Sequence, residues 1–235
     1  MRILLLLLTL LSISPFAAYT FQVEPMTAEL RPFGSESQVL LRITNTSNEK
    51  LTAEISSFDL LINSQGEEEL VLNEGDFLII PMTVIIAPGK SQSIVVKYIG
   101  EPVLTESITY RIDIRQLGVN LGKGNLASVG VNYNFQTLYS VVPEQASAQL
   151  VIKSKKQASA GIWKVKLANT GNKYARLLNT QWIIEGQNDK LVLDGRSLSD
   201  ALAGKLLLPN SSREVSLKVP GQFNAVLSKL TVVQE

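Results

Sequence analysis

The side chains that usually carry enzyme chemistry are absent or poorly placed in this chain. It has no cysteine and no histidine, which excludes thiol nucleophiles, cysteine-based zinc sites and His-centred triads. Asp59, Asp113 and Asp194 stand in no D-T-G or other catalytic context. The acidic run at 67–69 predicts a solvated turn, because a calcium loop needs more oxygen ligands at loop spacing. The sequence therefore predicts no catalytic residue, no metal site and no cofactor.

A glycine-containing segment at 122–124 resembles a phosphate loop only superficially. It reads Gly122-Lys123-Gly124 and lacks both the full G-x-x-x-x-G-K-[ST] pattern and the change from strand to helix that such loops require. We therefore interpret it as a flexible hairpin loop.

The segment that follows this loop has the most regular pattern in the chain. Large apolar side chains stand at Val129, Val131, Tyr133 and Phe135, and small or polar residues separate them. A period of two predicts a strand with one apolar and one polar face. Such a strand most often covers the core of its own protein. The pattern by itself leaves open whether this one does so or is presented to another protein.

The first residues predict a secretory signal peptide at 1–18. Arg2 supplies the positive charge, residues 3–13 are almost wholly apolar, and Ser14-Pro15 precedes small residues suited to cleavage. The apolar run is short for a membrane span. Without this segment the chain carries 21 basic and 21 acidic residues, so a nucleic-acid partner is not expected.

Most of the remaining sequence predicts short strands separated by turn formers. This arrangement favours an all-β fold of two β-sandwich domains, at 19–145 and 146–235, with the boundary placed where the composition shifts around Pro143. The only helix candidate is one turn at 198–202. The predicted strands are 38–44, 51–61, 77–80, 83–86, 93–98, 107–114, 129–137, 149–152, 163–167, 175–184, 190–193, 205–208, 214–219 and 226–233.

Several motifs in the first half resemble one protein family. The segment from Ile80-Pro81 reads on through Ala87-Pro88-Gly89-Lys-Ser-Gln92 to Tyr98, and then Glu106-Ser107-Ile-Thr-Tyr110 to Arg115. It is similar, with the same spacing, to the periplasmic pilus-assembly chaperones of the chaperone–usher pathway. Residues 39–48 also resemble this family. The second half does so more loosely, at 167–174 and 208–211.

The resemblance implies a fold, a location and partners. The fold would be two immunoglobulin-like β-sandwich domains, and the location the periplasm. The partners would be pilin-like subunits and an outer-membrane usher, and a self-capping homodimer is plausible because the free strand edge is exposed. In this family the strand before the interdomain proline completes a subunit that lacks its own last strand, which is β-augmentation. The matching residues here are Val129, Val131, Tyr133 and Phe135.

The chain departs from the family at the residues that hold the subunit's C-terminal carboxylate. The family uses an Arg and a Lys, because charge-assisted bonds to a carboxylate are strong. Here Thr27 stands in place of the Arg, and Thr137 or Leu138 in place of the Lys. Val142 replaces an Arg expected to pair with Glu106. These departures keep open an alternative function, a secreted structural or adhesion-type β-protein that shares the scaffold.

Overall fold

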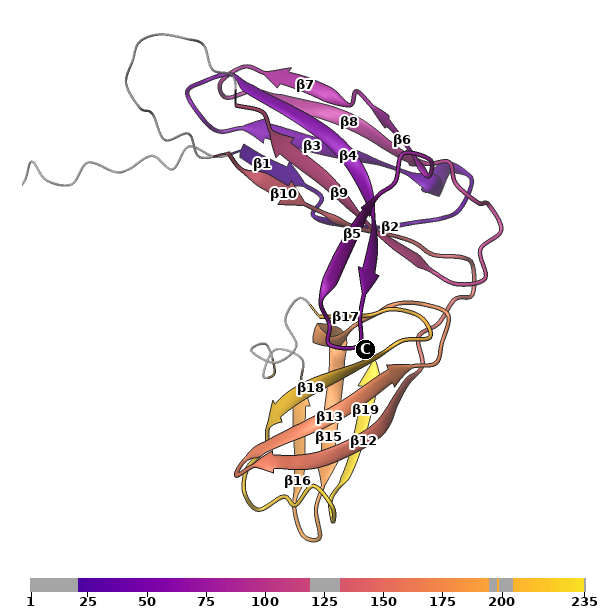
Figure 1. Ribbon diagram of the computed structural model, residues 1–235, viewed down its shortest axis with the longest axis vertical. Coiled ribbons are helices and arrows are strands. Elements are labelled where there is room, and N and C mark those ends of the chain that lie inside the picture. Colours follow the sequence, from indigo (N-terminus) through magenta and orange to yellow (C-terminus); the bar gives the residue numbers. More distant parts are fainter. Residues whose placement is uncertain (1–20, 119–131, 195–197, 199–204, 235) are drawn as a thin grey trace, which may run out of the picture.

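The computed structural model describes residues 21–118, 132–194, 198 and 205–234. The predicted signal peptide, most of the helix candidate at 198–202, and Val129 and Val131 lie outside these residues. Two sandwich domains follow one another along the chain (Figure 1), and the described part contains strands and two short 3-10 turns but no α-helix. This confirms the predicted all-β class. No helix in the described part is long and apolar enough to cross a membrane.

The N-terminal domain packs two sheets face to face. One has the strand order β1-β3-β8-β6, and the other has the order β2-β11-β9-β4-β5, with β10 also pairing with β9 and β7 with β4. The elements are β1 (Phe21–Glu24), β2 (Thr27–Leu30), η1 (Ser35–Ser37), β3 (Gln38–Asn45), β4 (Leu51–Ile62), β5 (Glu68–Leu72), β6 (Phe77–Ile80), β7 (Thr83–Ile86), β8 (Ser91–Tyr98), β9 (Ile108–Gln116), β10 (Asn134–Gln136) and β11 (Leu138–Val141).

The C-terminal domain consists of three smaller sheets. Their strand orders are β12-β13-β18, β14-β17 and β16-β15-β19. The elements are β12 (Leu150–Ser159), β13 (Ile162–Asn169), β14 (Ala175–Arg176), η2 (Leu177–Asn179), β15 (Thr180–Glu185), β16 (Lys190–Asp194), β17 (Leu206–Leu207), β18 (Ser212–Lys218) and β19 (Lys229–Gln234).

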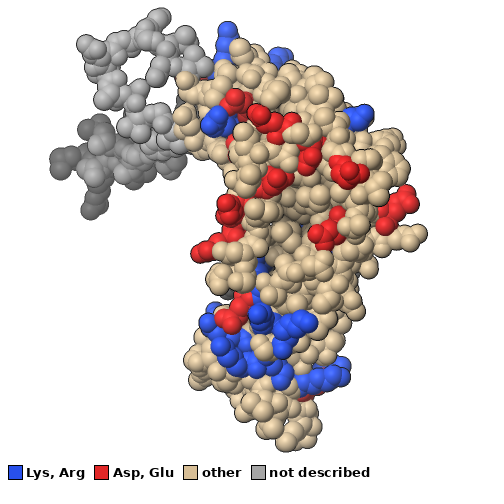
Figure 2. Space-filling view, turned by 45° about the vertical axis from the view of Figure 1, so that its right-hand side comes forward, with Lys and Arg blue, Asp and Glu red and all other residues tan. Residues whose placement is uncertain are grey.

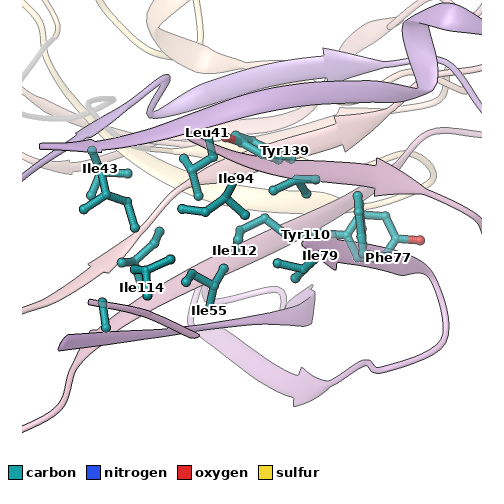
Figure 3. Packing of buried hydrophobic residues seen from close by; sticks show 14 of the residues in the cluster. Leu41, Ile43, Ile55, Phe77, Ile79, Ile94, Tyr110, Ile112, Ile114 and Tyr139 are labelled. Carbon is teal, nitrogen blue, oxygen red and sulfur yellow. The ribbon is translucent and has the colours of Figure 1, made fainter. Parts of the chain in front are cut away.

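Alternation along the strands builds the core of each domain. In the N-terminal domain the inward residues of β3 and β8 face those of β4 and β9 (Figure 3), for example Ile43 and Ile94 opposite Ile55 and Ile112. All four are fully buried, and each contributes about 1.5–3 kcal/mol by leaving water. The core of the C-terminal domain is centred on the buried rings of Trp163 and Trp182, which stand on different sheets.

A third apolar cluster joins the two domains. Its buried members are Leu60, Leu138, Val142, Tyr174 and Leu206. Leu60 belongs to the long hairpin of β4 and β5, which reaches from the N-terminal domain down to the C-terminal one (Figure 1). The hairpin therefore acts as a brace between the domains.

The tip of this hairpin is fitted closely against the C-terminal domain. Arg213 Nη2 donates a hydrogen bond to the carbonyl oxygen of Gly66 at 2.9 Å. Gly66 has a φ of +86°, and a Cβ built there would lie 2.2 Å from Arg213 Nη2. Glycine is required at this turn for both its backbone conformation and its lack of a side chain.

Several local predictions were wrong. Of the strand predicted at 129–137, the described residues form only β10, with Tyr133 before it and Thr137 between β10 and β11. The strand predicted at 175–184 is divided between β14 and β15 by η2, where the Thr180 hydroxyl donates to the Leu177 carbonyl. The acidic run at 67–69 is not simply a turn, because Glu68 belongs to β5 and binds Arg111 through both carboxylate oxygens. The last strand starts at Lys229 rather than at 226, since the Asn224 side chain accepts the next backbone N–H groups and closes a turn.

Candidate functional site: an open strand edge and the cleft between the domains

Among the described strands, one edge of β10 has no partner, whereas both edges of the next strand are paired. β10 pairs with β9 alone among the described strands, whereas β11 pairs with both β9 and β2. Leu138 N–H and Val142 N–H point away from β9 and donate to Met26 and Leu30 carbonyls, each at 2.8 Å. Backbone groups alternate along a strand. The N–H and C=O groups of Asn134 and Gln136 therefore point to the same side as the N–H of Leu138, away from β9. There the described residues provide them with no backbone partner.

The two described residues of the predicted apolar face lie in different surroundings. Tyr133 is 37% exposed. Phe135 is partly buried, and its ring meets the Phe21 ring edge-to-face at a centroid distance of 4.7 Å. Phe135 therefore packs on the protein's own core, and the apolar face emerges from the core toward Tyr133. Val129 and Val131, which would continue it, lie outside the described residues.

The open edge ends where β2 joins β11. Thr27 pairs with Leu138 in parallel register, so the β2 backbone occupies the edge from that point onward. Thr27 is exposed, but Thr137 is fully buried and its hydroxyl donates to the Ile112 carbonyl oxygen at 3.2 Å. The structure thus brings Thr27 to the surface of the cleft described next, and leaves Thr137 inside the N-terminal domain.

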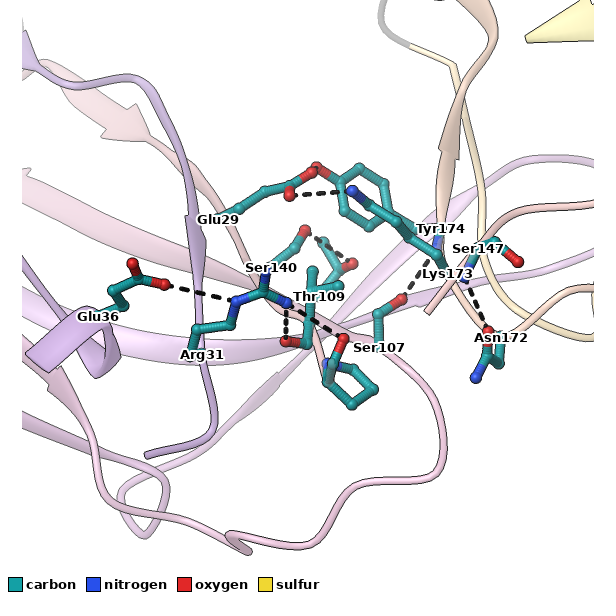
Figure 4. Close-up of polar contacts among 12 residues, drawn as sticks. Glu29, Arg31, Glu36, Ser107, Thr109, Ser140, Ser147, Asn172, Lys173 and Tyr174 are labelled. Atoms are coloured by element: carbon teal, nitrogen blue, oxygen red, sulfur yellow. Dashed lines mark hydrogen bonds and ion pairs between the residues drawn. The ribbon is translucent and has the colours of Figure 1, made fainter. Parts of the chain in front are cut away.

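A polar cleft of about 330 Å³ separates the outer edge of β2 from the C-terminal domain. It is lined by Thr27, Ala28, Glu29, Lys173, Tyr174, Arg176, Asn179 and Gln234. Figure 4 shows Glu29 bridging the domains, with Lys173 Nζ at 3.0 Å from one carboxylate oxygen and the Tyr174 hydroxyl donating to the other at 2.6 Å.

The titration of the cleft follows from these contacts. Partial burial alone would raise the pKa of Glu29, but the Tyr174 hydroxyl and the Lys173 ammonium outweigh it and hold that pKa below its ordinary value. Burial, aided by the neighbouring Glu29 carboxylate, raises the pKa of Tyr174 to about 12. Glu29 is thus negative and Tyr174 neutral at pH 7.

Arg176 gives the cleft an excess of positive charge. Its Nε is buried and has no hydrogen-bond partner among the described residues, and its guanidinium carbon lies 6.0 Å from the centre of the Tyr174 ring. Lys173 and Arg176 together outnumber Glu29 among the lining residues. The cleft therefore suits one further carboxylate, for which a guanidinium offers paired donors in a fixed geometry.

The sequence did not predict this pair of cations. Lys173 precedes the Tyr174 of a recognisable motif, but no local pattern shows that the following residues face β2 across the domain boundary. By contrast, the expected loss of the Val142–Glu106 link agrees with the contacts: Val142 joins the apolar interdomain cluster, and Glu106 accepts a hydrogen bond from Asn210 Nδ2 at 2.7 Å.

Searches against protein-family models and curated proteins found no match to this chain. Solved structures of fimbrial chaperones do match it. The class 5 fimbriae chaperone CfaA aligns with a TM-score of 0.59 and 16% identity over 92% of this chain and 100% of its own. A chaperone–tip adhesin complex of CFA/I fimbriae gives a TM-score of 0.58 and 19% identity over 83% and 87%.

A third match comes from an archaic chaperone–usher system. The CsuC–CsuE chaperone–tip adhesion subunit complex of Acinetobacter baumannii Csu pili gives a TM-score of 0.58 and 12% identity over 91% of this chain and 97% of that one. At such identities the likeness concerns the fold. The chain has the two-domain immunoglobulin-like fold of these proteins, and the expected resemblance is confirmed at that level.

Proposed function

We propose that this protein is a non-enzymatic periplasmic chaperone that binds pilus or fimbrial subunits by donating a strand. The subunit would pair with the open edge of β10, and the apolar side chains from Val129 to Tyr133 would fill the subunit's unfinished core, while Phe135 stays on the protein's own core. Delivery to an outer-membrane usher belongs to the same proposal.

One observation carries this proposal. The backbone of β10 at Asn134 and Gln136 faces an open edge at the point where an apolar side-chain face leaves the core. Strand addition needs both features, since backbone hydrogen bonds supply affinity and alternate side chains supply specificity. The fold supports the proposal, because solved structures with this fold include chaperones in complex with tip adhesins.

We further propose that the cleft holds the subunit's C-terminal carboxylate. In the family that this chain resembles, an Arg and a Lys of the N-terminal domain hold this carboxylate. Here Thr27 and Thr137 stand at the two positions. Arg176 and Lys173 stand across the cleft from Thr27, on the C-terminal domain, and can take over the charge. A subunit strand that ends where β2 closes the edge would have its last residue beside them.

The test is a pull-down of the tagged protein from periplasmic extract, followed by mass spectrometry. We expect a small β-rich subunit in a 1:1 complex, which is lost in Tyr133→Asp. Phe33→Asp is the matched control, since Phe33 is an exposed aromatic residue, 64% accessible, elsewhere on the same domain. If no subunit is captured while the neighbouring genes are expressed, the structural or adhesion-type alternative takes its place.

A second variant tests strand pairing itself. Asn134→Pro removes a backbone N–H that faces the open edge without removing a bond to β9. It should weaken capture of the subunit, whereas Asn134→Ala should not. Equal capture by both variants would argue against pairing at this edge.

A further inference from the structure

The two domains carry opposite net charges. Residues 21–145 contain 8 basic and 15 acidic residues, and residues 146–235 contain 13 basic and 6 acidic residues. The net charges are therefore −7 and +7. Figure 2 shows the same division on the surface, with Asp and Glu over the N-terminal domain and Lys and Arg gathered over the C-terminal domain.

Much of the positive charge lies on one sheet. Strands β12, β13 and β18 contain seven Lys or Arg residues and a single acidic residue, Glu214. Their outward positions are in register: Lys156 is opposite Lys164, Lys166 is opposite Glu214, and Lys218 is opposite Ile162. We call the exposed lysines Lys153, Lys156, Lys164, Lys166 and Lys218 the basic face.

This face is more than a solubilising surface. Lysines on an edge strand such as β12 have an ordinary purpose, since they discourage edge-to-edge pairing. That reason does not apply to Lys164 and Lys166, which stand on the central strand. In addition, Lys156 and Lys164 lie directly opposite one another, and like charges in that position destabilise a sheet. Glu214 offsets this only in part, through its ion pair with Lys164 at 2.9 Å.

The chemistry of the face disfavours two other partners. All four aromatic residues of the C-terminal domain, Trp163, Tyr174, Trp182 and Phe223, are buried, so no aromatic platform is available to stack nucleic-acid bases. A second copy that placed its acidic domain here would form a head-to-tail contact, and such contacts build open chains unless they close into rings. The basic face is built from lysines, which act as mobile point charges.

An array of exposed lysines suits a surface of many mobile anionic groups, as lipid headgroups provide, because each lysine acts as an independent point charge. Each lysine near an anionic bilayer adds to the attraction.

We propose that the basic face docks the protein on the anionic headgroups of a phospholipid bilayer. The acidic N-terminal domain is repelled from the same surface, so the molecule binds in one orientation, with the N-terminal domain directed away from the lipid. This proposal does not depend on the proposed chaperone function.

The test is co-sedimentation of the purified protein with lipid vesicles. We expect binding to mixed phosphatidylcholine and phosphatidylglycerol vesicles at about 0.05 M NaCl, loss of binding at about 0.5 M NaCl, and no binding to phosphatidylcholine alone. The combined variant Lys156→Gln, Lys166→Gln and Lys218→Gln leaves the Lys164–Glu214 pair intact. It should lower the partition coefficient by about 100-fold, because each lysine near an anionic surface contributes about 1 kcal/mol.

The matched control removes the same charge from the other domain. Lys50→Gln, Lys90→Gln and Lys97→Gln together should leave binding unchanged. An equal loss in both triple variants would reduce the effect to net charge and overturn the proposal. So would the absence of binding to the anionic vesicles, or a salt-sensitive self-association seen without lipid, which would assign the face to a second copy.

Discussion

At the scale of single residues, Arg176 matters most for the proposed function. Its Nε is buried without a hydrogen-bond partner in the described structure, and a buried donor left unpaired costs free energy until a ligand reaches it. A carboxylate entering the cleft would satisfy this donor. The arginine is thus better explained as half of a binding contact than as a structural ion pair.

The first prediction concerns this contact. Arg176→Gln should lower the affinity for the C-terminal peptide of the captured subunit by about 10- to 100-fold, as expected for a hydrogen bond to a charged group. Calorimetry with the free-acid and amidated forms of the peptide measures it. The amide should bind the wild-type protein as weakly as the acid binds the variant. If acid and amide bind the wild type alike, the cleft does not hold the carboxylate.

The second prediction concerns Glu29 and pH. Its folded-state pKa lies below the usual 4.5, so its ion pair contributes stability above pH 4.5 that is lost as the pH falls through the folded pKa. The difference in Tm between the wild type and Glu29→Gln should be constant well above the ordinary carboxyl pKa of 4.5 and shrink as the pH falls below it. A difference that stays constant over this range would contradict the assignment.

At the scale of elements, β10 both packs on the domain core and presents an open backbone edge, although it is only three residues long. Phe135 belongs to the domain core through Phe21, while the adjacent backbone faces the open edge. The alternating pattern in the sequence predicted the strand and its apolar face. It could not distinguish a side chain covered by its own core from one presented to a partner, because both need the same residue types at the same spacing.

The third prediction separates these two roles of β10. Phe135→Ala should lower the free energy of unfolding by about 2 kcal/mol or more, given that a fully buried Phe contributes about 3–5 kcal/mol. Tyr133→Ala, at a 37% exposed position, should change stability little and weaken subunit capture. Urea unfolding of both variants measures the first effect. Equal stability of the two would mean that the Phe21–Phe135 contact holds little of the fold.

Other elements show which features of the fold the sequence pattern predicts and which it does not. Strands such as β3, β8 and β9 were predictable because each alternates against a single core. The break at η2 was not, since Ala175 and Trp182 are both buried yet stand on different sheets. The brace was missed for the same reason: Leu60 looks like any inward strand residue, and its partner Leu206 is 146 positions away in the sequence.

At the scale of the whole molecule, the interdomain cluster replaces an ion pair with apolar contact. Val142 packs with Leu60 and Leu206 where an arginine was expected to meet Glu106. Such contact is insensitive to salt and pH in the neutral range. The hairpin of β4 and β5 therefore holds the domains together by apolar contact, alongside the bridge from Glu29 to Lys173 and Tyr174.

The fourth prediction tests this brace. Leu60→Ala should cost about 2–5 kcal/mol and separate the melting of the two domains into distinct calorimetric transitions. Leu61→Ala is the matched control, because Leu61 is the next residue and is 50% exposed, compared with 2% for Leu60. Melting that remains a single transition in Leu60→Ala would show that the domains are coupled through other contacts.

The charge division also belongs to this scale, and the overall composition concealed it. Equal numbers of basic and acidic residues argued against a nucleic-acid partner, although the charges are sorted by domain. The net charge of a chain limits its partners only when the charges are mixed along it.

Because β2 closes the edge beyond β10, the fold would limit how far a subunit strand can extend along this edge. An incoming strand can advance along β10 only until it meets Thr27, where β2 already pairs with Leu138. The last residue of the subunit strand would then lie beside Thr27. The number of residues between a side chain and this last residue would decide whether the side chain faces the subunit's core. A tail longer or shorter by one residue would turn every side chain to the opposite face. Partners would thus be selected by the parity of their tail length as well as by its sequence.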